Sequence, residues 1–197
     1  LNVAVGLQRL DVPATLHSSF GRDTHGAAVA AHLSASSVRV TPITVDDRPT
    51  SVALATIGSD GAASYTFTIE WDPAPLDVPT GTFDAVHIGS IGAALEPGAT
   101  LVERLVAEAQ PSATISFDPN VRPQLMGPAD TARPRIERLV AIADVVKASD
   151  EDLAWLYPDA AASDVAQNWL ALGPALVGVT RGGDGADALS AAGRIWV

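Results

Sequence analysis

The second half of the chain alternates short, largely apolar stretches with longer segments of helical pattern, and this alternation constrains the fold more than any other feature. The short stretches cover residues 83–88, 114–117, 145–148 and 176–180. The longer segments cover residues 97–109, 129–142, 149–156 and 161–172. Alternating strands and helices predict an α/β fold, in which helices cover both faces of a mainly parallel sheet. Within the second helix, Pro134 is expected to be a first-turn residue or a break.

The first half of the chain has a different pattern, which includes a predicted β-hairpin. Residues 51–57 and 64–69 are rich in residues that favour strands, and Ser59-Asp60-Gly61 lies between them as a turn signal. Three elements are expected before the hairpin: a helix over residues 2–10, a strand over 14–20 and a helix over 25–33 that Asp23 and Thr24 can cap.

The composition is that of a folded protein with an acidic surface. Of the 197 residues, 47% are hydrophobic and only 18% are charged, which is unlike a disordered chain. The net charge of −11 disfavours nucleic acid as a partner, although backbone N–H groups can still hold a phosphate ligand. The absence of Cys excludes disulfides and Cys-based zinc sites. No apolar run approaches the roughly 18 residues of a membrane span and no signal peptide is visible, so a cytoplasmic protein without a membrane partner is expected.

Polar residues follow three of the predicted strands. Asp118, Lys147 and Thr180 each lie near the carboxyl end of a strand. In parallel α/β sheets, ligands bind at the carboxyl ends of the strands. We therefore expect a ligand site at this edge of the sheet.

The stretch Asp118-Pro119-Asn120-Val121-Arg122 has two interpretations. If it stays extended, as its prolines favour, Asp118, Asn120 and Arg122 lie on one side. A carboxylate, an amide and a guanidinium could then recognise a polyhydroxylated or phosphorylated ligand. Alternatively, the stretch is a surface turn in which Asp118 bonds to Arg122. The residues alone leave both interpretations open.

Two further stretches also have a structural and a functional interpretation. Residues 180–185 contain three Gly, so they could bring backbone N–H groups close to an anion, or simply form a turn between antiparallel strands at 176–180 and 187–189. Residues 147–152 suit the start of a helix capped by Ser149, with Asp152 three residues on, although Asp152 could also help to organise Mg²⁺ through water. In both cases the residues alone favour the structural interpretation. The four His residues show no metal-ligand spacing.

Together and in this order, these stretches resemble the ribokinase-like (PfkB) carbohydrate kinases, and most closely the fructokinase branch. Residues 117–123 are similar to its Phe-Asp-Pro-Asn-x-Arg-Pro stretch, residues 146–153 to its Lys-x-Ser-x-Glu-Asp/Glu segment, and residues 179–186 to its Thr-x-Gly-x-x-Gly. Residues 2–10 resemble the helix after the family's Gly-Gly sugar-binding turn, and residues 21–26 its Gly-x-Asp-x-x-Gly. Asp11 departs from the Gly or Ser of the first signature. The resemblance covers nearly the whole chain.

The resemblance implies a ribokinase-like three-layer αβα fold with a mainly parallel central sheet and a small β-sheet lid. The kinase core would comprise residues 1–40 and 80–197, and the lid residues 41–79. The implied activity is ATP-dependent phosphorylation of a sugar hydroxyl, with ATP and Mg²⁺ as cofactors and a homodimer formed through the lid. Fructose is the first candidate substrate. The alternatives are a kinase of another sugar or of a sugar acid such as 2-keto-3-deoxygluconate, and a truncated relative that binds sugar or nucleotide without catalysis.

The resemblance also implies roles for individual residues. Substrate binding falls to Asn2, Phe67, Asn120 and Arg122, with Arg122 also supporting catalysis. Nucleotide binding falls to Lys147, Ser149, Thr180, Gly182 and Gly185, and an indirect metal contact to Asp152. The family's catalytic Asp, in an Asp-Thr-x-Gly-Ala-Gly-Asp motif, is expected beyond Val197, and the Gly-Gly turn before Asn2, so the chain is expected to be incomplete at both ends. Asp118 is therefore not the expected catalytic base.

Overall fold

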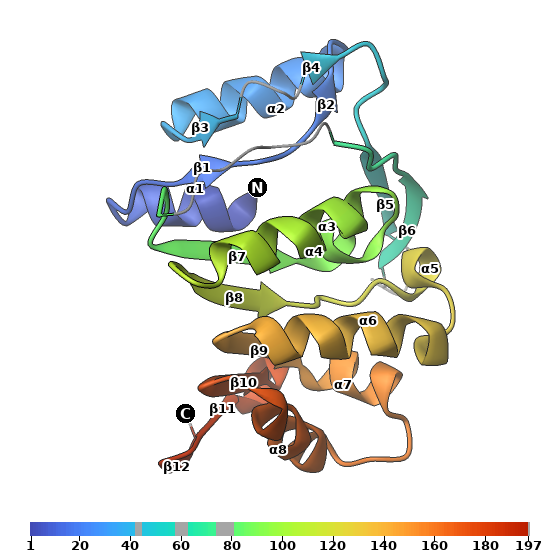
Figure 1. The fold of residues 1–197 in the computed structure, drawn as a ribbon. Helices are drawn as coiled ribbons and strands as arrows, with labels where there is room; N and C mark the ends of the chain where they lie inside the picture. The colour runs from blue at the N-terminus through green and yellow to red at the C-terminus, as the bar shows by residue number, and fades with distance from the viewer. Residues whose placement is uncertain (42–44, 58–62, 74–80, 197) are drawn as a thin grey trace. The chain divides into compact units, whose positions relative to one another are not determined.

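The computed structural model describes residues 1–41, 45–57, 63–73 and 81–196, and the chain divides into two compact units (Figure 1). The first unit is Leu1–Leu76 and the second is Asp77–Val197. The predicted turn at Ser59-Asp60-Gly61 lies outside the described residues. None of the helices in the described ranges is long and apolar enough to cross a membrane.

The first unit places two helices beside short paired strands. The helices are α1 (Asn2–Arg9) and α2 (Thr24–Ala35), which confirms the helices predicted over residues 2–10 and 25–33. The strand predicted over residues 14–20 is instead two short strands that pair in parallel with later ones: β1 (Thr15–Leu16) with β3 (Arg39–Val40), and β2 (Phe20–Gly21) with β4 (Val45–Asp46). The small core of this unit consists of Ala4, Val5, Ala14, Phe20, Leu33 and Val38.

The predicted hairpin is present as β5 (Val52–Ile57) and β6 (Ala63–Thr68), which pair in antiparallel register. Ala55 lies opposite Tyr65, and Ala53 lies opposite Phe67. Because side chains alternate along a strand, Tyr65, Phe67 and Ile57 share one face, while Leu54 and the opposite Thr66 share the other. The rings of Tyr65 and Phe67 stack with their centroids 6.0 Å apart.

The second unit is built on one six-stranded sheet in the order β12-β11-β10-β9-β8-β7. Four strands run in parallel: β7 (Ala85–Gly89), β8 (Thr114–Asp118), β9 (Val145–Ser149) and β10 (Leu176–Thr180). The last two are antiparallel: β11 (Ala186–Ser190) and β12 (Gly193–Trp196). The helices are α3 (Ser90–Ala94), α4 (Gly98–Ala109), α5 (Pro123–Met126), α6 (Ala129–Ile142), α7 (Asp150–Leu156) and α8 (Ala162–Leu172). A mainly parallel sheet with helices confirms the predicted α/β fold.

The core of the second unit lies between this sheet and its helices. Along β8 and β9, every second residue is buried, including Ile115, Phe117 and Val146. These side chains pack in one cluster with Val106 of α4 and Trp169 of α8. The alternation turns Ser116 and Lys147 to the other face of the sheet. The core therefore fixes which side chains of each strand remain available at its carboxyl end.

Pro134 does not mark the start or the end of a helix, contrary to the prediction. It lies inside α6, which continues unbroken from Ala129 to Ile142. Proline keeps a helical φ, and the one hydrogen bond that it removes is near the beginning of the helix, so the remaining turns can form. The core residues Ile136, Leu139 and Val140 follow Pro134 on α6, and their burial favours the continued helix.

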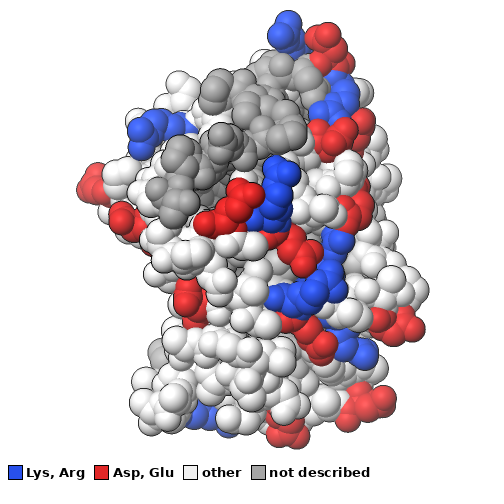
Figure 2. Space-filling view, in the orientation of Figure 1, with Lys and Arg blue, Asp and Glu red and all other residues white. Residues whose placement is uncertain are grey.

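Charged side chains are mixed on the face shown in Figure 2, where blue basic groups lie next to red acidic ones. The described ion pairs on the helices include Arg138 of α6 with Glu103 of α4, at 3.0 Å. Arg135 of α6 likewise pairs with Glu96. Exposed pairs of this kind contribute little to stability, about 0–1 kcal/mol each.

Candidate functional site

The carboxyl ends of β8, β9 and β10 meet at one edge of the sheet, as the sequence predicts. Thr180 lies opposite Ser149 in the parallel register of β10 and β9. Asp118 at the end of β8 forms an ion pair with Lys147 of β9, with 3.2 Å between Oδ2 and Nζ. The polar residues that follow the three strands are therefore neighbours in space.

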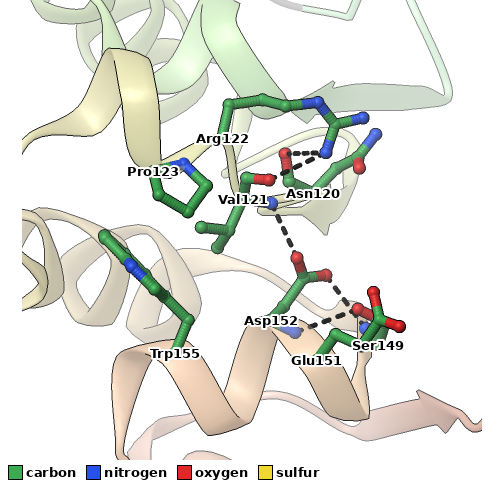
Figure 3. A pocket seen from close by; sticks show the side chains of 8 residues that line it. All are labelled: Asn120, Val121, Arg122, Pro123, Ser149, Glu151, Asp152 and Trp155. Carbon is green, nitrogen blue, oxygen red and sulfur yellow. Dashed lines mark hydrogen bonds between the residues drawn. The ribbon is translucent and has the colours of Figure 1, made fainter. Parts of the chain in front are cut away.

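A pocket opens at this edge, with a volume of about 220 Å³ (Figure 3). It brings together four of the predicted site residues: Asn120, Arg122, Ser149 and Asp152. The other residues that line it are Val121, Pro123, Glu151 and Trp155. One wall of the pocket comes from the loop after β8, and the other comes from α7. Sequence reasoning missed Glu151 and Trp155; Trp155 lies three residues after Asp152, a spacing that places both on one side of a helix.

The loop after β8 is not extended throughout, because its backbone leaves the extended region at Asn120. Asn120 has a φ of +36°, in the left-handed region, and its N–H donates to Asp118 Oδ1 at 3.1 Å. Arg122 Nη1 donates to the carbonyl oxygens of Val121 (2.8 Å) and Asn120 (3.3 Å). The bond of the alternative interpretation, a surface turn in which Asp118 bonds to Arg122, is not found in the described ranges: Asp118 accepts from Asn120 and Lys147, and Arg122 donates to two carbonyl oxygens.

The helix α7 begins with the predicted cap. Ser149 Oγ accepts the N–H of Asp152, and Asp152 Oδ2 accepts the N–H of Ser149, both at 3.0 Å. The other carboxylate oxygen of Asp152 accepts the N–H of Val121 at 2.8 Å. The carboxylate is therefore a buried link, 7% exposed, between the start of α7 and the loop after β8.

The pocket can accommodate a magnesium ion only if phosphate and water supply most of its ligands. No group of three or more His, Asp or Glu side chains could hold a metal ion within the described ranges. Both oxygens of Asp152 already accept an amide, and Glu151 contributes a second carboxylate to the pocket. Mg²⁺ is commonly bound by one or two carboxylates together with waters and substrate phosphates, so the residues present fit an indirectly held ion.

The predicted turn at residues 180–185 joins antiparallel strands, β10 and β11. Gly182 and Gly185 have φ values of +55° and +92°, which only Gly adopts readily. Arg181 closes the turn, since its N–H donates to the carbonyl oxygen of Gly185 at 2.9 Å. The turn lies beside Ser149 through the pairing of Thr180, but Thr180, Gly182 and Gly185 are not among the residues that line the pocket.

A buried carboxylate that the sequence did not predict holds this turn. Asp187 of β11 is 2% exposed, and its Oδ2 accepts Nη2 of Arg181 at 2.9 Å. Its Oδ1 accepts Nε of Arg194, on β12, at 2.7 Å. Burial alone would raise the pKa of Asp187, but the hydrogen bonds and charges of the two arginines lower it below its ordinary value. The pair of arginines thus keeps Asp187 ionised and links the start of β11 to the preceding turn and to β12.

Three further predicted site residues, Lys147, Asn2 and Phe67, are not among the residues that line the pocket. Lys147 is on the sheet face opposite the core and is paired with Asp118. Asn2 is an exposed residue at the start of α1, and Phe67 is half-buried on β6. Both Asn2 and Phe67 belong to the first unit. Their predicted contacts with a substrate stay predictions.

The arrangement of strands and helices matches solved carbohydrate kinases. The Vibrio cholerae O395 fructokinase in its fructose, ADP and calcium ion bound form gives a TM-score of 0.82 at 26% identity, covering 100% of this chain and 66% of that one. The Halothermothrix orenii fructokinase gives a TM-score of 0.87 at 21% identity, with coverage of 100% and 72%. The fold is therefore the ribokinase-like α/β fold, with a small antiparallel sheet in addition to the main one.

The sequence comparison narrows this class to a family. The model of the pfkB family carbohydrate kinases matches residues 1–196, and the chain belongs to this family. A fructokinase of Rhizobium leguminosarum bv. trifolii is 32% identical in an alignment of 191 residues, which covers 94% of this chain and 58% of that protein. The fructokinase of Klebsiella pneumoniae is 30% identical, and 64% of its length is covered. The chain thus spans about 60% of the length of these relatives.

Proposed function

We propose that the full-length protein transfers a phosphoryl group from ATP to a sugar hydroxyl, with fructose as the first candidate substrate. The observation that carries this proposal is the pocket, where Asn120, Arg122, Ser149 and Asp152 converge at the carboxyl ends of β8 and β9. The family match over residues 1–196 and the fructokinase relatives support the choice of reaction and substrate.

In this proposal, Arg122 lies beside the sugar and the transferring phosphoryl group. Its Nη1 is engaged by two carbonyl oxygens, and no hydrogen bond from Nε or Nη2 is found within the described residues. A guanidinium with free N–H groups suits the equatorial oxygens of a phosphoryl group, whose charge must be balanced during transfer. Asn120 contributes a side-chain amide that can bond to sugar hydroxyls.

The nucleotide would lie toward β9 and β10. Ser149, Thr180 and the turn glycines Gly182 and Gly185 are the proposed contacts on that side, with Lys147 as a further cation of the same edge. Backbone N–H groups of a glycine turn can approach phosphate oxygens closely. Mg²⁺, if bound with the phosphates, would neutralise their charge, and Asp152 and Glu151 are the carboxylates that could hold its waters.

Asp118 is not proposed as the base that accepts the hydroxyl proton. Its two carboxylate oxygens are occupied by the N–H of Asn120 and the ammonium of Lys147. A base must reach the reacting hydroxyl within hydrogen-bonding distance, and a paired carboxylate is poorly placed for that. We propose, from the family resemblance, that the base belongs to the motif expected after Val197.

We further propose that residues 41–79 form a lid whose hairpin, β5 with β6, mediates a homodimer. Among the described residues, these two strands pair with no other strand. Leu54 is 62% exposed, Ile57 is 66% exposed and Tyr65 is 50% exposed. A two-stranded sheet is marginally stable alone, and exposed apolar side chains of this kind mark interaction surfaces.

The test is a kinase assay on the full-length protein with ATP, Mg²⁺ and a panel of hexoses and 2-keto-3-deoxygluconate. We expect fructose to give the highest kcat/KM. Arg122→Ala should lower kcat/KM by about 10²–10³-fold, as the loss of a charge-stabilising donor does. Arg138→Ala is the matched control, because Arg138 lies on the surface of α6, and it should leave the kinetics unchanged.

Each part of the proposal can fail separately. No sugar-dependent consumption of ATP with any substrate would refute the kinase function. A preference for 2-keto-3-deoxygluconate would retain the kinase but replace fructose by a sugar acid, whose carboxylate Arg122 could pair with. Full activity of Arg122→Ala would remove Arg122 from the site.

A further inference from the structure

Two neighbouring strands of the second unit are joined at their carboxyl ends by a side-chain hydrogen bond. β7 ends at Gly89 and β8 ends at Asp118, and these two residues lie opposite each other in the parallel register. Directly after them, Ser90 Oγ donates to the carbonyl oxygen of Asn120, at 3.1 Å. The bond therefore connects the start of α3 to the loop that forms one wall of the pocket.

Both residues of this bond have unusual backbone conformations. Ser90 has a φ of +49° and Asn120 a φ of +36°. The left-handed region is tolerated by Asn but is unfavourable for most other residues that carry a Cβ. Such conformations persist where the surrounding structure holds them, and they are frequent at functional sites. Two of them, just after the ends of adjacent strands and bonded to each other, indicate a local arrangement that is fixed by contacts.

The strand ends are also in close backbone contact. A Cβ placed on Gly89 would lie 2.2 Å from the carbonyl oxygen of Asp118, so only Gly fits at this position. This close approach brings the next residue, Ser90, near the loop after β8. Gly89, which has no side chain, is the cap residue of α3, and Ser90 is the first residue of the helix. The Ser90 hydroxyl bonds to the neighbouring loop.

The carbonyl oxygen of Asn120 is shared between Ser90 and Arg122. Arg122 Nη1 donates to it at 3.3 Å and to the carbonyl oxygen of Val121 at 2.8 Å (Figure 3). On the other side of the loop, Asp152 Oδ1 accepts the N–H of Val121 at 2.8 Å. The loop is thus held from the start of α3 by a hydroxyl and from α7 by a carboxylate. The Arg122 guanidinium donates to the same carbonyl oxygen as Ser90.

We propose that Ser90 is a positioning residue for Arg122: its hydroxyl fixes the Asn120 carbonyl group on which the guanidinium rests. The proposal depends on the proposed kinase function only for its kinetic consequence. Without the hydroxyl, Arg122 keeps its charge but loses its defined orientation toward the pocket. Small displacements of a charge-stabilising group reduce the rate of the reaction, because the catalytic effect depends on its exact placement.

Two variants of the full-length protein separate the hydroxyl from the backbone conformation. Ser90→Ala removes the hydroxyl and keeps the Cβ at a positive φ, whereas Ser90→Gly removes the hydroxyl and relieves the backbone. We expect kcat/KM for the sugar to fall about tenfold in both variants, while the KM for ATP stays unchanged. A tenfold change corresponds to about 1.4 kcal/mol, which is the contribution of roughly one hydrogen bond. Ser163→Ala, on α8, is the control and should match the unaltered protein.

A second measurement does not require catalysis. Amide hydrogen exchange of a peptide covering residues 118–126 should be faster in Ser90→Ala and Ser90→Gly, and unchanged in Ser163→Ala, because the loop has lost one of its anchors. If Ser90→Gly has unaltered kinetics and exchange, the residue matters only for its backbone and the proposal is overturned. Unchanged exchange in both variants overturns it as well. If the unaltered protein phosphorylates no sugar, the proposed function fails, and the exchange result alone decides the role of Ser90.

Discussion

Asp23 shows how a single carboxylate can organise a turn. Its Oδ1 accepts the N–H of Gly26 at 2.8 Å and the hydroxyl of Thr50 at 2.7 Å, and its Oδ2 accepts the N–H of Thr50 at 2.8 Å. Gly26 fits against this turn only without a side chain, since a Cβ would lie 1.8 Å from the carbonyl oxygen of Gly21. The hydrogen bonds from Gly26 and then from Thr50 lower the pKa of Asp23 from 3.8 to about 2. The start of α2 and the entry to the hairpin thereby depend on one ionised group.

This lowered pKa predicts a dependence of stability on pH. A carboxylate whose pKa is lower in the folded state contributes stability that is fully present above its unfolded value, near 3.8, and is lost as the pH falls toward 2. In the full-length protein, Asp23→Asn should therefore flatten the decline of the unfolding midpoint between about pH 4 and pH 2. Thermal unfolding at several pH values measures this. Asp164→Asn, in the first turn of α8, is the control; equal slopes for Asp23→Asn and the unaltered protein would contradict the prediction.

At the scale of helices, Tyr157 connects three elements of the second unit. Its hydroxyl donates to Glu137 of α6 at 2.7 Å and accepts Nε1 of Trp169, on α8, at 2.9 Å. Arg133 of α6 lies over its ring, 5.0 Å from the centroid. Burial raises the pKa of Tyr157 to about 12; the bond from Trp169 acts in the opposite direction, and Glu137 raises it further. The residue directly after α7 thus fixes the relative positions of α6 and α8.

Removing the hydroxyl should weaken this junction measurably. Tyr157→Phe leaves the N–H of the buried Trp169 without its acceptor, which costs about 1–3 kcal/mol. We expect a decrease of this size in the free energy of unfolding, measured by chemical denaturation of the full-length protein. Tyr65→Phe, on the exposed hairpin, should change it by less than about 0.5 kcal/mol. A similar loss in both variants would show that the hydroxyl of Tyr157 has no special role.

Elements with a clear period were predictable from the sequence, whereas short ones depended on contacts. The helices over residues 129–142 and 161–172 agree within one residue with α6 and α8, because each has a long pattern of its own. α3 and α5 have only five and four residues and were not predicted. The conformation of the loop at Asn120 and Val121 could not be predicted either, since its contacts come from α3 and α7, 30 and 31 residues away in the chain.

Only the part of the pocket that follows from the order of strands was predictable. Asn120, Arg122, Ser149 and Asp152 follow the ends of strands, and the rule for parallel sheets places them at one edge. Glu151 and Trp155 line the pocket because they lie on the side of α7 that faces the loop after β8. Packing determines which side that is. The sequence favoured an antiparallel pairing of β10 with β11, but the link between Asp187 and its two arginines also requires the pairing of β11 with β12, which the sequence pattern did not specify.

At the scale of the whole molecule, the exposed apolar side chains of the hairpin are the feature on which the proposed dimer rests. The two strands expose apolar side chains on both faces: Ile57 and Tyr65 on one, Leu54 on the other. With a net charge of −11, the chain is acidic overall, so association through an uncharged patch would avoid bringing like charges together. A homodimer through the hairpin would bury these side chains, and each fully buried Leu or Ile contributes about 1.5–3 kcal/mol.

A charge placed on the hairpin should therefore separate the subunits, and two variants can identify the face that makes the contact. Leu54→Glu and Ile57→Glu alter opposite faces. We expect sedimentation of the full-length protein to show a dimer, and one of the two variants to shift it to the monomer, because a carboxylate buried without a partner is costly. Leu172→Glu, at an exposed apolar position at the end of α8, is the control and should remain dimeric. A monomer for the unaltered protein would refute the dimer. Dimers for both hairpin variants would show that the interface is not formed by the hairpin.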